Sequence, residues 1–306
     1  MQNWISSLYP AFTVVAFFLI PTFLVIGVFS LYVRKYKAEH ITPLTDGFLR
    51  EAGHSLRLKY EDQRQDLISK LFFMMLISVF PFAITGAGQL FGKNIPLLGQ
   101  YLLIVIIMGF MVRKLWTQIR STRQMRLGLE AEIACGQALT ELLRCGWYVF
   151  HDIPSNKPNV RFNIDHILIG PPGVFVVETK GRSKSRSKSG RKEWKLAYRN
   201  GRLEFPGWTE TRPFEQAQIN AKYITQWLSR ASGVKFIAEP VLLFPGWYVE
   251  VKTKPPFPLI GNPEYIIKEL KKKTQVNLTP EQCGQIAWQV EQAVKLSGYV
   301  DEKGHY

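Results

Sequence analysis

One stretch of the chain, from Asn163 to Lys180, limits the fold more than any other. It reads NIDHILIGPPGVFVVETK, two apolar segments joined by a Gly-Pro-Pro-Gly turn, and predicts a β-hairpin. Asp165 and Glu178 are equally far from the turn centre, so a symmetric hairpin sets them opposite each other. Two facing carboxylates repel, which favours a cation between them. Lys180 is expected on the same strand face as Glu178, because side chains two residues apart point the same way.

Two acids and a lysine on one face predict a metal-dependent phosphodiester site. Asp165 and Glu178 are expected to hold Mg²⁺ or Mn²⁺, and Lys180 to orient the attacking water or stabilise charge on the phosphate. No small-molecule cofactor is expected. The alternative is a structural ion pair at a sheet end. The pattern ExK alone does not select a site, because it occurs four times: Glu178/Lys180, Glu193/Lys195, Glu250/Lys252 and Glu269/Lys271. Only the first lies on an apolar strand that faces an aspartate.

The first 112 residues contain three runs without charged side chains, at 11–33, 71–91 and 95–112. Each is predicted to cross a bilayer, which takes roughly 20 apolar residues in a helix. Eight Lys and Arg lie between the first two runs, one lies between the second and third, and five follow within 113–126. The positive-inside rule therefore predicts an outside N-terminus and a cytoplasmic chain after Val112. A buried hairpin of a soluble protein is the alternative.

Residues 113–127 are predicted to form a basic juxtamembrane helix, and 128–306 a cytoplasmic domain. Its pattern of helices and strands indicates an α/β sandwich with a mixed sheet. The expected helices are 130–145, 213–230, 263–273 and 280–296, and the expected strands are 147–153, 163–170, 174–180, 194–198, 202–205, 234–244, 247–251 and 258–260. The three cysteines are far apart, which fits a reducing compartment and argues against a zinc ribbon.

A strongly basic run follows the predicted site and contributes to the net charge of +15. Between Lys180 and Arg202 there are ten Lys and Arg against one acid, Glu193. This composition predicts contacts with nucleic-acid phosphates. The expected contact residues are Arg182, Lys184, Arg186, Lys188, Arg191 and Lys192. A solvated hairpin and a site for anionic lipid are the two alternatives.

Five motifs, taken in order, resemble the nuclease-related domain (NERD) family. They are Gly128-Leu129-Glu130-Ala131-Glu132, His151-Asp152-Ile153-Pro154, Asn163-Ile164-Asp165-His166, Gly173-Val174-Phe175-Val176-Val177-Glu178-Thr179-Lys180 and Pro213-Phe214-Glu215-Gln216-Ala217. The resemblance covers about 128–245 and implies a restriction-endonuclease-like fold. It places Glu132, Asp165, Glu178 and Lys180 at the family's acidic and basic site positions, and Gln216 at its later polar helix position. Ala131 departs from the glycine that the family usually has there.

The resemblance also implies a bacterial protein and a partnership with a helicase, a topoisomerase or DNA-transfer machinery. Any motor must be a separate protein, since the chain contains no GxxxxGK[ST] phosphate loop. We therefore expect a nuclease at the cytoplasmic face of the inner membrane that acts on DNA, with RNA left open. One rival is a membrane-tethered DNA-binding adaptor without catalysis. Another is a channel or transporter subunit, although no charged residue lies inside the three apolar runs.

Two histidines near the site are expected to be structural. His166 follows Asp165 and should point to the opposite face of the sheet, where a packed or capping role is favoured. His151 and Asp152 are expected to anchor a loop. Glu132 is expected to act as an outer metal ligand or to support the ligands, with an ordinary glutamate in the first turn of a helix as the alternative.

Overall fold

The computed structural model describes residues 21–22, 24–36, 49–90, 97–155, 163–184, 194–255, 257 and 259–303. The chain divides into two compact units. One consists of Met1–Leu44 and Glu61–Thr122, and the other of Thr45–Tyr60 and Arg123–Tyr306. The division places a short segment from the first fifth of the chain in the same unit as the predicted nuclease-like domain.

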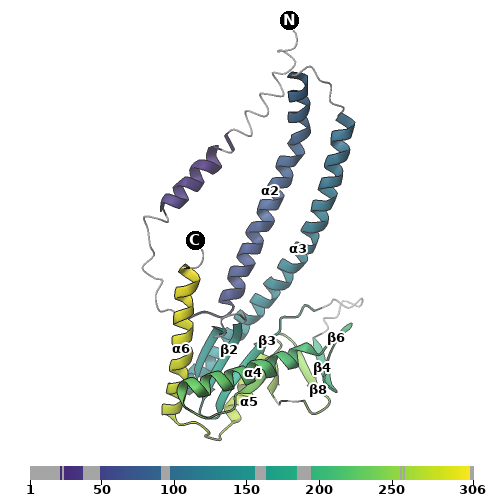
Figure 1. Ribbon diagram of the computed structural model, residues 1–306. Coiled ribbons are helices and arrows are strands. Elements are labelled where there is room, and N and C mark those ends of the chain that lie inside the picture. The colour runs from purple at the N-terminus through teal and green to yellow at the C-terminus, as the bar shows by residue number, and fades with distance from the viewer. Residues whose placement is uncertain are drawn as a thin grey trace. The chain divides into compact units, whose positions relative to one another are not determined.

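Two long helices, α2 (His54–Leu90) and α3 (Leu97–Leu139), supply most of the described part of the first unit and run side by side (Figure 1). Polar side chains connect them. Gln118 is the centre of this contact: it accepts a hydrogen bond from Lys70 Nζ at 2.8 Å and donates one to Asp66 Oδ2 at 2.7 Å. Thr122 donates to Gln63 at 3.3 Å one turn further along α3.

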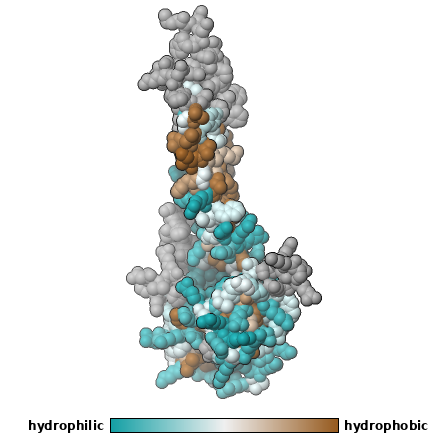
Figure 2. Space-filling view, turned by 90° about the vertical axis from the view of Figure 1, so that its right-hand side faces the viewer, coloured by the Kyte–Doolittle hydropathy of each residue, from teal (hydrophilic) through white to brown (hydrophobic). Residues whose placement is uncertain are grey.

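The structure does not support the prediction of three membrane spans. Among the described residues, one helix, Leu98–Cys145, is long and apolar enough to cross a membrane by length and composition. It contains most of the third predicted span. The first predicted span, 11–33, lies largely outside the described residues. The second, 71–91, falls on α2, where most side chains beyond Val79 are outside the described set. Figure 2 shows apolar residues gathered on the surface of these helices.

A five-stranded mixed sheet forms the centre of the second unit. Its strands are β1 (Tyr148–Pro154), β2 (Asn163–Gly170), β3 (Gly173–Thr179), β7 (Glu239–Leu243) and β9 (Leu259–Gly261), in the order β1-β2-β3-β7-β9. The first three are antiparallel, and β3, β7 and β9 are parallel. The mixed α/β architecture that the sequence predicts is therefore confirmed.

Helices cover both faces of this sheet. On one face, buried residues of β1, β2 and β3 pack against α4 (Arg212–Ser232) and α6 (Pro280–Lys303). On the other, they pack against the end of α3, the 3-10 turn η1 (Thr140–Cys145) and α5 (Pro263–Lys272). The predicted helix at 130–145 is the last part of α3 and this turn, and Gly146 ends it in the left-handed conformation that glycine favours.

The structure differs from the sequence-based prediction of a single mixed sheet, because it contains a second sheet. It has four strands in the order β6-β5-β4-β8: β4 (Lys195–Arg199), β5 (Arg202–Phe205), β6 (Trp208–Glu210) and β8 (Tyr248–Val251). A core rich in aromatic residues, including Phe205, Phe214, Phe244 and Trp247, packs against one of its faces. Strand β6 has three residues, too few to show a periodic pattern in the sequence.

Candidate active site

The β2–β3 hairpin has the symmetric register that its sequence predicts. Gly170 pairs with Gly173 beside the turn, and the paired positions continue outward to His166 and Val177. The next step in this register brings Asp165 and Glu178 to opposite positions. Glu178 is 2 % exposed, and Asp165 Oδ2 accepts a hydrogen bond from the backbone N–H of Thr179 at 2.6 Å. The hairpin therefore holds two carboxylates together at the end of the sheet.

Glu178 is bonded through both of its carboxylate oxygens. Lys180 Nζ donates to Oε1 at 2.6 Å, and Asn220 Nδ2 donates to Oε2 at 2.8 Å. Lys180 Nζ also donates to Gln216 Oε1 at 2.8 Å, and its backbone N–H donates to Leu243 O on β7 at 2.8 Å. The lysine that the sequence places beside the acids is thus fixed by both its main chain and its side chain.

Helix α4 supplies Gln216 and Asn220, which are four residues apart and so lie on the same side of the helix. The sequence analysis does not include Asn220 among the site residues. Its signal is a polar residue within the apolar stripe of α4: Asn220 is 3 % exposed and lies between buried Ala217 and Ile224. A buried amide in such a stripe requires a hydrogen-bond partner, and here that partner is Glu178.

Glu132 on α3 adds a third acid to the same region. Burial, together with the charges of Asp152 and Glu178, raises its pKa to about 7. Burial and the charges of Glu178 and Glu132 raise the pKa of Asp165 well above its usual value. The pKa of Glu178 is also raised by burial, against the opposing effect of Lys180. Three carboxylates that disfavour one another's ionisation are a common feature of catalytic sites.

The backbone at Gly181, just beyond the end of β3, lies very close to α3. A Cβ at Gly181 would lie 2.5 Å from Leu127 O and 2.9 Å from Ala131 Cβ, both on α3. Only a glycine on the strand side allows this distance, and a small residue at 131 reduces crowding on the helix side. The packing of Gly181 against α3 therefore brings Glu132 toward the hairpin acids.

Asp152 forms a buried network with the segment 45–60. Its Oδ2 accepts hydrogen bonds from Ser55 Oγ at 2.7 Å and Ser55 N at 3.1 Å, and pairs with Arg50 at 3.3 Å. Asn163 Nδ2 donates to Oδ1 at 2.8 Å. Ser55 lies in the first turn of α2, where backbone N–H groups have no partner within the helix, and Asp152 accepts a hydrogen bond from one of them. The negative charge of Asp152 also interacts favourably with the positive end of the helix dipole. Arg50 and Ser55 are absent from the sequence-based site because their segment has no motif.

The two histidines lie beside each other across β1 and β2. His151 Nδ1 and His166 Nδ1 are 2.8 Å apart, and the rings meet edge to face. Burial lowers the pKa of His151, and burial together with His151 lowers that of His166 well below its usual value. Both are therefore neutral, packed side chains at pH 7, while Asp152 rather than His151 ties the segment 45–60 to the sheet.

The donor set of the acid cluster fits a hard divalent cation. Lys180 is the cation bonded to it in the part of the chain that the structure describes. One ammonium group cannot balance the charges of the three carboxylates Glu132, Asp165 and Glu178, and their pKa values are raised accordingly. Within that same part, no three His, Cys, Asp or Glu side chains form a ready ligand group. Asp165 and Glu178 would thus be the protein ligands, with water completing the coordination, as Mg²⁺ tolerates.

The predicted phosphate-binding residues fall into two groups. Arg182 forms a two-fold ion pair with Glu210, at 2.7 and 2.6 Å, and Lys184 Nζ lies 5.8 Å from the centre of the Trp247 ring. A phosphate would have to compete with Glu210 for Arg182. The other four, Arg186, Lys188, Arg191 and Lys192, lie outside the described residues.

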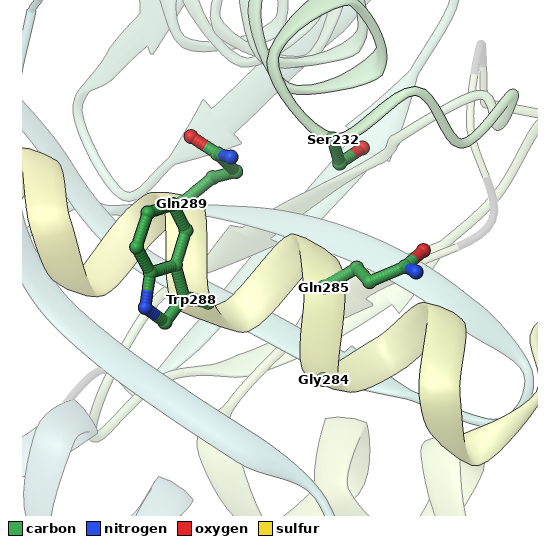
Figure 3. Close-up of a pocket in the computed structure, with 5 residues that line it drawn as sticks. All are labelled: Ser232, Gly284, Gln285, Trp288 and Gln289. Atoms are coloured by element: carbon green, nitrogen blue, oxygen red, sulfur yellow. The ribbon is translucent and has the colours of Figure 1, made fainter.

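A hollow beside α6 does not carry this chemistry. One cavity of about 360 Å³ is lined by Ser232, Gly284, Gln285, Trp288 and Gln289 (Figure 3). None of these side chains is ionisable, and Figure 3 shows Trp288, Gln285 and Gln289 projecting from α6. The acid cluster is therefore the better candidate for hydrolysis.

Comparison with known proteins agrees with this placement. A search of curated proteins and a search of solved structures each gave no match. One family model matches, over residues 127–245, from the last part of α3 to just beyond β7. The matched region contains all the acids of the cluster, Lys180 and Gln216. The family is described as "NERD: Nuclease-related domain", and the match supports the assignment of this part of the chain to it.

Proposed function

We propose that this protein is a membrane-anchored, metal-dependent nuclease that hydrolyses phosphodiester bonds of DNA. One observation carries the proposal: Glu132, Asp165 and Glu178 come together from α3, β2 and β3, with raised pKa values and Lys180 Nζ 2.6 Å from Glu178. The match to the nuclease-related domain supports it. A structural ion pair between Glu178 and Lys180 would not explain why Glu132 and Asp165 are also held beside it.

In this proposal Asp165 and Glu178 hold Mg²⁺ or Mn²⁺ through carboxylate oxygens. When bound, the ion supplies charge stabilisation at the phosphate and lowers the pKa of water. Glu132 supports the ligands from α3, where its carboxylate adds negative charge behind them. The proposal requires no small-molecule cofactor.

In this proposal Lys180 acts on the reacting phosphate. Its ammonium group is held by Glu178 and Gln216, so it is oriented before substrate arrives. A fixed cation beside a phosphodiester stabilises the negative charge that develops during hydrolysis. Asn220 holds the second oxygen of Glu178 and thereby fixes the carboxylate plane. Gln216 and Asn220 are positioning residues, because each acts through Lys180 or Glu178.

The test is cleavage of labelled linear duplex, nicked duplex, single-stranded DNA and RNA by the purified full chain in detergent, with Mg²⁺, Mn²⁺ or EDTA. Cutting that requires a divalent cation supports the proposal. Binding of DNA without cutting under any of these conditions contradicts it. The full chain is required because the segment Thr45–Tyr60 belongs to the same compact unit as the acid cluster.

The main alternative is a DNA-binding adaptor that recruits a separate nuclease or motor protein. It is favoured by the hydrogen bonds that already occupy both oxygens of Glu178, and by the lack of a three-ligand group among the described side chains. An adaptor should bind DNA equally well with and without divalent cations. The nuclease should cut only with them, so one experiment separates the two.

Membrane anchoring is proposed through the apolar parts of α2 and α3. On α3, Leu98, Val105, Ile106 and Phe110 are 78, 68, 61 and 69 % exposed. Exposing so many large apolar side chains to water is unfavourable, and a bilayer would remove the cost. The basic residues after Val112 favour a cytoplasmic location for the second unit at a bacterial inner membrane.

Cys145 provides a native probe of this topology, because it is exposed whereas Cys135 and Cys283 are buried. We expect a membrane-impermeant maleimide to label Cys145 in inverted inner-membrane vesicles and to leave it unlabelled in intact spheroplasts. The Cys145→Ser variant, which should lose the label, serves as the control. Equal labelling in both preparations would contradict a cytoplasmic domain.

A further inference from the structure

The four-stranded sheet has one covered face and one open face. In β4, Leu196 and Tyr198 are buried in the aromatic core, whereas Lys195 and Arg199 at the two ends of the strand are exposed. In β5, Leu203 is buried and Arg202 is exposed. Successive side chains of a strand alternate between faces, so the exposed residues of both strands share one surface. We call this surface the outer face.

At one edge of the outer face, two aromatic rings and a lysine form what we call the platform: Trp194, Lys195 and Tyr248. Trp194 and Tyr248 are 49 and 50 % exposed, and their ring centres lie 5.6 Å apart with the ring planes at 70° to each other. Lys195 Nζ lies 5.2 Å from the Trp194 ring centre and 5.8 Å from that of Tyr248. The backbone N–H of Tyr248 donates to Trp194 O at 2.8 Å, which fixes the two residues side by side.

The platform is connected to the chain that leaves the acid cluster. Trp247, the neighbour of Tyr248, is 1 % exposed and donates its Nε1–H to Arg182 O at 3.1 Å. Arg182 follows Lys180 by two residues. Lys184 Nζ lies near the ring of the same tryptophan. A short link through the buried side chain of Trp247 therefore joins the lysine of the site to the platform.

What sets the platform apart from a single exposed ring is that two exposed rings and a cation lie together. Two other cations at or near the outer face are in ion pairs: Arg199 with Glu204 at 3.8 Å and Lys252 with Glu250 at 3.7 Å. Lys195 forms no ion pair with any acid that the structure describes. Its ammonium group lies beside two exposed aromatic rings, and this combination matches a ligand with an aromatic face and a phosphate.

We propose that the platform stacks unpaired bases of a single DNA strand and that Lys195 contacts the adjoining phosphate. This rests on the proposed function and specifies its substrate class as single-stranded DNA or a single-stranded region of a duplex. In a duplex the faces of the bases are stacked on one another, so they are inaccessible to protein rings. In a single strand they are free, and stacking on aromatic side chains is the usual way in which proteins bind them.

The test measures binding in EDTA, so that cleavage plays no part. The full chain in detergent is titrated into a fluorescein-labelled oligothymidylate of about 20 nucleotides, and into a duplex of equal length, and anisotropy is recorded. Trp194→Ala and Tyr248→Ala are each expected to weaken single-strand binding roughly tenfold. Both should leave duplex binding unchanged, and Tyr248→Phe should retain the single-strand affinity.

Trp288→Ala is the matched control, because Trp288 is an equally exposed tryptophan, 56 %, on α6 of the same unit (Figure 3). It should bind the single strand as the unaltered protein does. The platform proposal is overturned if Trp194→Ala and Tyr248→Ala bind the single strand normally, or if they weaken single-strand and duplex binding equally. It is also overturned if they reduce only binding to anionic lipid vesicles, which would assign the platform to the membrane surface.

The two proposals can fail separately. Loss of single-strand binding in the platform variants, with no cleavage of any substrate, would support the platform and contradict the nuclease. Metal-dependent cleavage with unaltered single-strand affinity in the same variants would do the reverse.

Discussion

Replacing Glu178 by glutamine is expected to lower the rate of metal-dependent DNA cleavage by about a thousandfold, in the range found when one group that stabilises the transition state is removed. Glutamine retains the size of the side chain and one oxygen, so it can still accept a hydrogen bond from Asn220 or Lys180. What it loses is the negative charge that a divalent cation needs. The initial rate of cleavage of a labelled oligonucleotide, at saturating Mg²⁺, is the quantity to measure.

Glu269→Gln is a suitable control for this variant. Glu269 belongs to another ExK sequence but lies on α5, where it pairs with Lys272 on the surface at 2.6 Å. Its replacement should leave the rate unchanged. A Glu178→Gln protein that melts like the unaltered protein and cuts DNA at a similar rate would show that Glu178 is a structural residue.

The contribution of Glu132 to the stability of the metal-free protein is expected to become less favourable as the pH rises from about 4.5 to about 7. The carboxyl of Glu132 has a pKa of about 7 when folded and an ordinary value of 4.5. Below pH 4.5 it is protonated in both states and costs nothing. As the pH rises, the unfolded state ionises first, which stabilises it relative to the folded state. Above pH 7 the full cost is present, on the order of 3 kcal/mol.

Comparison with Glu132→Gln isolates this contribution, since the neutral His151 and His166 make stability change with pH in the opposite direction. In EDTA, Glu132→Gln should melt well above the unaltered protein at pH 8 and show a much smaller difference at pH 4. Mg²⁺ should reduce the difference at pH 8. Glu130→Gln, on the exposed side of the same helix, should show neither effect. A constant difference at all pH values would contradict the buried acid cluster.

The hairpin could be predicted in detail because its information is local. The Gly-Pro-Pro-Gly turn sets the centre, and alternation of apolar residues sets the faces, so the register that opposes Asp165 and Glu178 follows from counting. The mixed α/β architecture also follows from the order of the periodic segments. Lys180 lies beside Glu178 because the two are separated by one residue on an extended chain.

Contacts between distant segments could not be predicted in this way. Arg50 and Ser55 reach Asp152 over about a hundred residues of chain, and nothing in their segment marks them as part of a site. Asn220 is recognisable only once α4 is known to lie against β3. The division into two sheets depends on aromatic packing between β5, β7 and α4, which periodicity does not encode.

The most direct test of the central claim, that the acid cluster holds a divalent cation and cuts DNA with it, is a titration of the full chain with Mn²⁺. Bound Mn²⁺ is read by electron paramagnetic resonance, and cleavage of labelled DNA is followed in the same samples. We predict that the cleavage rate rises in proportion to bound Mn²⁺ and that both are lost together in Asp165→Asn. Mn²⁺ binding and cleavage that persist in Asp165→Asn, or cleavage in EDTA, would contradict the claim.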